Sequence, residues 1–207
     1  MTVPLPPLPP VPEEGYRPGG PSVVDLVERE HRQLLDLLDL VDRVTGPDAA
    51  PQRLAEVVEV LTAVVSRHLS AEEQYLFPAV RAAVPGAAAA VDREVGAAAE
   101  LLAALKALAG PADPALTDVA DRVRRHVAGT AALLASLREV ATAAELIRLG
   151  NRWEIAEEAA PTRPHPGTPA SPPWNRIVEP AVGVVDKVRD AVTGRPTYAS
   201  DLLPPGD

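Results

Sequence analysis

The stretch His68–Pro78, which reads HLSAEEQYLFP, decides how the rest of the chain is interpreted. On an α-helix, His68 and Glu72 lie one turn apart on the same face. The apolar positions in and just before this segment share that face: Leu61, Val64, Val65, Tyr75 and Leu76. Burying a carboxylate without a partner costs several kcal/mol, so a core-facing glutamate needs one. An imidazole and a carboxylate at this spacing direct their ligand atoms into one volume, which suits a metal ion. Glu73 lies at the edge of the stripe, where we expect it to be solvated.

The composition limits the class of protein. The 207 residues suffice for one domain with tails, and 46% of them are hydrophobic although only 3% are aromatic. We therefore expect a core packed mainly by leucine, valine and alanine. The formal net charge of −9 argues against nucleic acid or an anionic membrane as a partner. The absence of cysteine excludes thiolate metal sites, iron–sulfur clusters and disulfides.

The sequence contains no segment typical of targeting or membrane insertion. Its N-terminus lacks a basic region followed by an apolar run, so no signal peptide is expected. No apolar stretch approaches the length of a membrane span. We therefore expect a soluble, cytoplasmic protein.

Apolar residues at helical spacing predict four long amphipathic helices joined by short loops. No alternating strand pattern is present, so the expected fold is all-α, an up-down-up-down four-helix bundle. A further short helix, capped by Thr142, follows the bundle and runs to about residue 160. The four main helices are expected over residues 22–45, over residues 51–84 with a kink allowed at Pro78, over residues 87–109, and from Asp113-Pro114 onward.

Proline-rich segments flank the bundle predicted over residues 22–160. Because residues 1–21 are dense in proline and glycine, we expect a disordered arm that acts as a flexible tether. The alternative is that this arm docks on an SH3-like partner. Residues 161–207 are expected to form a second proline-rich tail, with a short amphipathic helix at about residues 177–193. The sequence identifies no protein partner for either tail.

Three histidines accompany Glu72 on core-facing stripes. His31, His68 and His126 lie on the first, second and fourth predicted helices, whereas His165 lies in the proline-rich tail. A single histidine on an apolar face is more often a hydrogen-bonded core residue than a ligand, and a single glutamate can simply pair with one of them. All histidines of the bundle face the core together with a carboxylate, and this combination favours one shared site.

These residues resemble the hemerythrin-like, or HHE cation-binding, domain. The resemblance is carried by DLVEREHRQLLDLL around His31, by HLSAEEQYLFP from His68 and by RRHVAGT around His126, and it covers about residues 22–166. It implies a four-helix bundle that holds a non-haem di-iron centre. It also implies chemistry with O₂, NO or peroxide, or a role in iron sensing.

Two positions depart from the family pattern. The family carries a histidine on its third helix, where this chain reads REVGAAAELLAAL and places Val95 at the matching position. The family also repeats His-x-x-x-Glu on its fourth helix, where His126 is followed four residues later by Thr130. The resemblance therefore implies that a helix-three imidazole and a bridging carboxylate are missing.

The remaining ligand set predicts a reduced metal site. By the resemblance, His31, His68 and Glu72 serve one metal, and His126 is left as a fourth ligand or as a proton donor to bound oxygen species. Two imidazoles and a carboxylate are typical of mononuclear non-haem iron sites with open positions, and the same set suits zinc.

We expect a metal-binding protein whose iron is mononuclear or absent, with a small oxidant as its ligand and slow redox chemistry or sensing as its activity. No enzyme class is predicted. The alternative is a metal-free, degenerate bundle that serves as an interaction or structural module.

Overall fold

The computed structural model describes residues 18–45, 50–166, 183, 185–187 and 189–203. Every regular element in these residues is helical, which confirms the predicted all-α fold. The long helices are α1 (Val23–Val44), α2 (Pro51–Ala71), α4 (Ala88–Ala107), α5 (Leu116–Val140) and α6 (Ala143–Ala159). Three short elements complete the set: the π-helical turn η1 (Glu72–Leu76), the helix α3 (Phe77–Ala83) and the 3₁₀ turn η2 (Ala199–Asp201).

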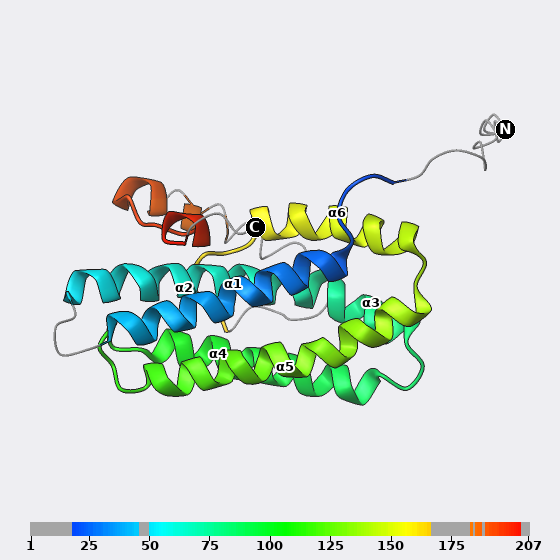
Figure 1. Ribbon diagram of the computed structural model, residues 1–207, viewed down its shortest axis with the longest axis horizontal. Coiled ribbons are helices and arrows are strands. Elements are labelled where there is room, and N and C mark those ends of the chain that lie inside the picture. Colours follow the sequence, from blue (N-terminus) through cyan, green and yellow to red (C-terminus); the bar gives the residue numbers. More distant parts are fainter. Residues whose placement is uncertain (1–17, 46–49, 167–182, 184, 188, 204–207) are drawn as a thin grey trace, which may run out of the picture.

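Four helical rods form the bundle, and a fifth helix lies on its outside. In Figure 1, α1 and α2 form one layer and α4 and α5 the other, with successive helices antiparallel. The second rod is α2 continued through η1 and α3. The fifth helix, α6, packs against α1, α2 and η1. Side chains of α6 can therefore reach the middle of the bundle only through the α1–α2 layer.

Capping side chains fix where α1 and α6 begin. The hydroxyl of Ser22 accepts a hydrogen bond from the Asp25 backbone N–H at 3.2 Å, as the sequence predicts for the start of the first helix. At α6, Thr142 and Glu145 form a complete capping box, in which each side chain binds the other residue's backbone N–H. These bonds satisfy N–H groups that have no partner inside the helix.

The second helix passes Pro78 through a π-helical turn. The backbone N–H of Phe77 donates to the carbonyl of Glu72, five residues earlier. Proline cannot donate to the residue four positions back, and its ring clashes with that carbonyl. Widening the helix by one residue just before Pro78 relieves both problems, because it shifts the carbonyls of the preceding turn. Glu72 thus stands at the first position of a distorted turn.

The third and fourth rods are slightly shorter than predicted. Helix α4 ends at Ala107, and α5 begins at Leu116, not at the expected Asp113-Pro114. The Asp113 carboxylate accepts the backbone N–H groups of Ala109 and Ala115 at 2.8 and 2.9 Å. Asp113 therefore closes the α4–α5 loop before the helix starts.

The buried apolar side chains form two clusters, one toward each end of the bundle. The first cluster takes members from all four rods, including Leu34, Leu61, Ala98 and Val123. The second cluster also draws on all four rods and on α6, including Val27, Leu76, Val91, Leu134 and Trp153. A polar layer lies between them, because His31 falls between Val27 and Leu34 along α1 and His126 falls between Val123 and Leu134 along α5.

Helix α6 approaches the start of α1 very closely at Gly150. A Cβ atom at this position would lie 2.3 Å from the Pro21 carbonyl oxygen, so only glycine fits there. Nearby, the Asn151 side chain donates to the carbonyl of Gly19 at 3.3 Å. Of the arm predicted over residues 1–21, only residues 18–21 are described, and the rest lies outside the described residues.

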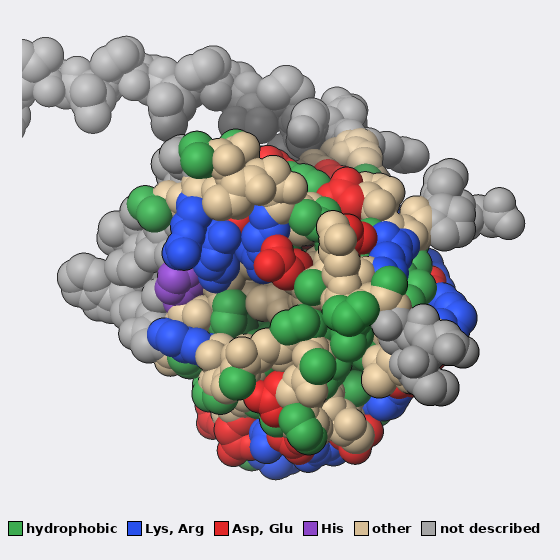
Figure 2. Space-filling view, turned by 90° about the vertical axis from the view of Figure 1, so that its left-hand side faces the viewer, with side chains coloured by type: hydrophobic (Ala, Val, Ile, Leu, Met, Phe, Trp, Pro, Cys, Tyr) green, Lys and Arg blue, Asp and Glu red, His purple; other side chains and the backbone are tan. Residues whose placement is uncertain are grey.

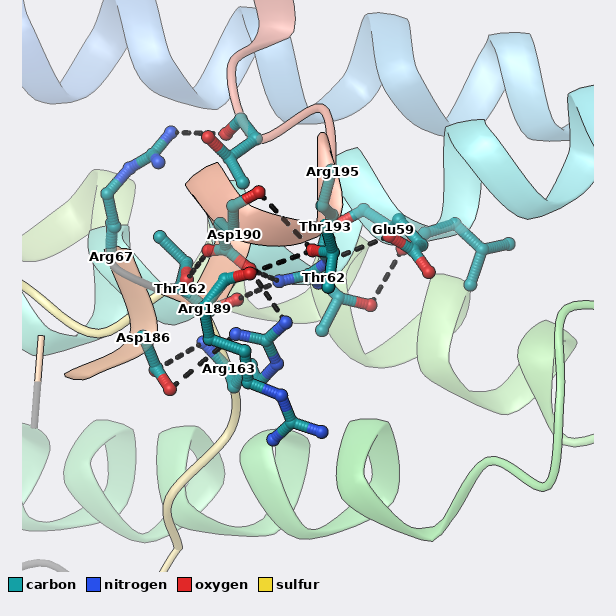
Figure 3. A network of polar contacts seen from close by, with 12 residues as sticks. Glu59, Thr62, Arg67, Thr162, Arg163, Asp186, Arg189, Asp190, Thr193 and Arg195 are labelled. Carbon is teal, nitrogen blue, oxygen red and sulfur yellow. Dashed lines mark hydrogen bonds and ion pairs between the residues drawn. The ribbon is translucent and has the colours of Figure 1, made fainter.

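A buried aspartate in the C-terminal segment joins it to the residues that follow α6 (Figure 3). Asp190 accepts a hydrogen bond from the Thr162 hydroxyl and pairs with Arg163 at 2.7 Å and with Arg195 at 3.3 Å. Of the helix predicted over residues 177–193, residues 183, 185–187 and 189–193 are described, and all of them are helical. The remaining positions of that prediction lie outside the described residues.

Two arginines, one in the C-terminal segment and one on α2, connect this segment to α2 (Figure 3). Arg195 pairs with Glu59 at 2.8 Å. Arg67, which is 2% exposed, donates to the Thr197 carbonyl at 2.7 Å and lies over the Tyr198 ring, 4.4 Å from its centroid. The C-terminal segment is therefore held on the side of α2 that carries Arg67.

The surface mixes charges of both signs. On the end face drawn in Figure 2, basic, acidic and hydrophobic side chains are interspersed over the coloured residues. None of the helices in the described ranges has the length and apolarity needed to cross a lipid bilayer.

Candidate metal centre

The polar layer brings all four predicted site residues together. His31 comes from α1, His68 from the last turn of α2, Glu72 from the start of η1 and His126 from the middle of α5. One ligand atom from each residue can be chosen such that all lie within 4.8 Å of one another. Helical spacing and antiparallel packing thus converge four side chains from three rods on a single volume.

Glu72 lies at the centre of this cluster. Its Oε2 is 3.1 Å from His126 Nε2, and its Oε1 is 3.4 Å from His68 Nε2 and 4.0 Å from His31 Nε2. The Glu72 side chain is fully buried, and the three histidines are at most 5% exposed. The imidazole rings stand edge to face, with centroids 5.0 to 5.9 Å apart.

The facing atoms of the cluster lack well-directed hydrogen bonds. Within the described residues, the Nε2 atoms of the three histidines and both carboxylate oxygens of Glu72 are buried without a hydrogen-bond partner. Their contacts are short but do not have hydrogen-bond geometry. Buried polar atoms are nearly always satisfied, so five orphans at one point require a cause. A cation at their centre would satisfy them together, and three imidazoles with one carboxylate are ligands suited to iron or zinc. The residues therefore fit a metal ion.

The electrostatics of the metal-free cluster are set by burial and by the two carboxylates near His68. Burial alone would lower the pKa of His68, but Glu72 and Glu30 outweigh it and raise this pKa to about 10. Burial likewise opposes the charge of Glu72, but the imidazoles of His126 and His68 hold the Glu72 pKa well below its usual range. Burial and the positive charge of His68 lower the pKa of His31 to about 3.

We expect two histidines of the metal-free cluster to make stability depend on pH in opposite directions. The lowered pKa of His31 makes the unfolded chain bind an extra proton below pH 6.5, so stability falls on acidification by up to about 1.4 kcal/mol per pH unit. The raised pKa of His68 contributes stability below pH 6.5, which is lost as the pH rises toward 10. Urea unfolding of chelator-treated protein at pH 5, 6, 7 and 9 measures both limbs. Between pH 6 and pH 5 the parent should lose stability relative to His31→Gln, and an equal change in both proteins would contradict the assignment.

A buried acidic residue that is not among the predicted site residues lies beside the cluster. Glu30 is 3% exposed, and its Oε2 lies 2.8 Å from His68 Nδ1. A signal for it was available, since Glu30 lies three residues after Val27 and four before Leu34, on their core-facing side. Because the histidines and Glu72 by themselves define the predicted site, Glu30 is not part of that prediction.

The departures from the family pattern lie in or beside the same layer. Thr130 is fully buried, and its hydroxyl has no hydrogen-bond partner in the described part of the chain. Val95 is half-buried and packs against the second apolar cluster. The expectation that Glu73 is solvated is wrong, because this side chain is only 6% exposed where α6 packs against η1. His165 contacts Asp186 at 3.1 Å, outside the cluster.

Comparison with known proteins identifies the family but no individual relative. No curated protein and no solved structure matches the chain. The family model described as the hemerythrin HHE cation binding domain matches residues 22–149, well over half of the chain. The matched range contains His31, His68, Glu72 and His126, whose ligand atoms meet in the polar layer. The chain therefore belongs to the hemerythrin HHE cation-binding domain family.

Proposed function

We propose that this chain is a hemerythrin-like metal-binding protein with a reduced site that holds one non-haem iron ion. His31, His68 and Glu72 would bind the ion, and His126 would be its fourth ligand. The observation that supports this proposal is the convergence of five buried atoms that lack hydrogen-bond partners. Leaving such groups unsatisfied is costly in a metal-free fold, and ligation removes that cost.

The side chains that α4 and α5 contribute to the polar layer favour a single bound ion. A Cβ atom on Gly129 would lie 2.6 Å from the carboxylate of Glu94. Glu94 and Gly129 are therefore at the same level of the antiparallel helices α4 and α5. Val95 is then level with the turn of α5 that carries His126 and Thr130. Neither valine nor threonine replaces the imidazole and carboxylate that a second iron would need.

The expected activity is slow redox chemistry or sensing of O₂, NO or peroxide. A bound iron ion would supply electron transfer to such a ligand. The chain's own residues fix the ion's surroundings: all four proposed ligands are at most 5% exposed, so only a small molecule can reach them. Zinc fits the same ligands and would give a structural site without redox chemistry.

A metal-free structural module is the second candidate, and the surroundings of His68 favour it. Its Nδ1 is 2.8 Å from Glu30 and its Nε2 is 3.4 Å from Glu72. An imidazolium between two carboxylates can balance the buried charge without a metal. In that case the cluster would hold the helices in register, as a buried ion pair, and would do nothing further.

Metal analysis of the purified chain separates the two candidates. Protein from iron-supplemented cultures is expected to contain close to one iron per chain, and the anaerobic ferrous form should change its absorption spectrum when NO is added. Near-stoichiometric zinc would support the site but not the redox role. A folded protein that neither contains metal nor takes up Fe²⁺ or Zn²⁺ during dialysis would contradict the proposal and support the structural module.

A further inference from the structure

The carboxylate of Glu30 connects the cluster to a helix outside the bundle. One oxygen, Oε2, lies 2.8 Å from His68 Nδ1. The other, Oε1, accepts a hydrogen bond from the indole N–H of Trp153 at 2.8 Å. Trp153 is fully buried on α6, and its ring centroid is 5.6 Å from that of His68. A hydrogen-bonded chain thus runs from α6 through α1 to a proposed metal ligand on α2.

We propose that Glu30 and Trp153 are positioning residues of the metal centre, which makes α6 its fifth structural helix. This inference rests on the proposed function, because it assigns them a role toward a metal bound by His68. The family model matches only residues 22–149, so Trp153 lies beyond the matched domain. The chain therefore adds its own support to a site that the domain supplies.

The proposed role follows from the donors and acceptors involved. An ionised carboxylate only accepts hydrogen bonds, so His68 Nδ1 must carry a proton where it faces Glu30. In the neutral imidazole, the lone pair then resides on Nε2, the atom that faces Glu72 and the other histidines. Glu30 thereby fixes both the tautomer and the direction of the ring, as carboxylates behind ligating histidines do in metal sites.

Trp153 in turn fixes Glu30. Without the indole donor, Glu30 would keep only His68 and the neighbouring Glu157 carboxyl as contacts, and its carboxylate could rotate away from His68. The position of Trp153 is secured by the close approach of α6 to α1 at Gly150 and by the contact of Arg67 with Glu157 at 3.9 Å. The indole is therefore presented from a rigid helix.

Glutamine at position 30 tests this arrangement because it has the same shape and different hydrogen bonding. A carboxylate can accept from His68 and from Trp153 at once. A carboxamide has one accepting oxygen, and its NH₂ group would face one of the two donors. Glu30→Gln must therefore break one of the two bonds, whereas Trp153→Phe removes one donor and leaves every charge in place.

The experiment uses the full-length chain and measures Zn²⁺ affinity by competition with a chelator. We expect Glu30→Gln to bind Zn²⁺ about 10–100-fold more weakly than the parent, and Trp153→Phe about tenfold more weakly. A second measurement follows the Nδ1-bound proton of His68 by NMR of the Zn²⁺-loaded, ¹⁵N-histidine-labelled protein. A strong hydrogen bond to a carboxylate should place this proton far downfield, and both substitutions should shift it.

Glu28→Gln is the matched control, because it removes a carboxylate from the same helix. Glu28 is 43% exposed in its side chain and pairs with Arg138 on the surface, so both measurements should equal those of the parent. If Zn²⁺ affinity falls while the His68 proton stays in place, the effect is general destabilisation and the proposal is overturned. Parental affinity in both Glu30→Gln and Trp153→Phe would also overturn it and leave the proposed function intact. A parent that binds neither Zn²⁺ nor Fe²⁺ would overturn the proposed function and this inference together.

Discussion

Replacing Glu72 by alanine is expected to abolish stoichiometric metal binding. Among the described residues, Glu72 is the only carboxylate of this four-residue cluster, and each of the three histidines lies within 4.0 Å of one of its oxygens. Its removal takes away the negative charge that offsets the ion as well as one of four ligands. Because structural zinc sites with four ligands are worth roughly 10–16 kcal/mol in total, losing one should weaken binding at least about a hundredfold.

The measurement is metal content after dialysis against one equivalent of Fe²⁺ or Zn²⁺, with helicity checked by circular dichroism. His68→Ala should behave in the same way, since it removes a ligand from the same helix. Glu73→Ala is the control, because Glu73 is the adjacent buried carboxylate and contributes no ligand atom to the cluster. Parental metal content in both Glu72→Ala and His68→Ala would mean that the ion, if any, binds elsewhere.

The part of the fold that could be predicted from the sequence depends on local periodicity. The apolar stripes of α1, α2, α4 and α5 repeat at helical spacing, and this repeat determines both the helices and the faces that they bury. His31, His68 and His126 lie on those stripes, so their burial follows from the same pattern. Antiparallel packing through short loops then requires that the three histidines meet at similar levels of the bundle.

The features that could not be predicted depend on contacts between distant segments. Glu30 accepts a hydrogen bond from Trp153, 123 residues later in the chain, and no local sequence pattern around either residue predicts that contact. The sequence allows a kink at Pro78, and in the structure the turn before this proline, Glu72–Leu76, is π-helical. A proline in the sequence does not specify whether the turn before it is α-helical or π-helical.

The double substitution Val95→His, Thr130→Glu is expected to raise metal binding from one ion to two per chain. From the contact between Glu94 and Gly129 we infer that Val95 lies level with the His126–Thr130 turn, and Thr130 stands four residues after His126 on the same buried face. Together the new side chains would complete a set of four histidines and two carboxylates. Either substitution alone should fail, because Thr130→Glu buries a charge at a cost of roughly 1–3 kcal/mol and Val95→His adds an imidazole with few partners.

Binding of a second iron by the double variant should change its thermal stability as well as its metal content. Ligation compensates the buried charge only when metal is present, so the double variant should melt below the parent in chelator and recover most of the difference with Fe²⁺. An absorption band typical of oxo-bridged iron should accompany the second ion and be absent from the parent. Two irons in the parent would contradict the inference that Val95 and Thr130 cost the chain its second site. A double variant that binds no more iron than the parent would place the error in the register of α4, since the level of Val95 is inferred from the contact between Glu94 and Gly129.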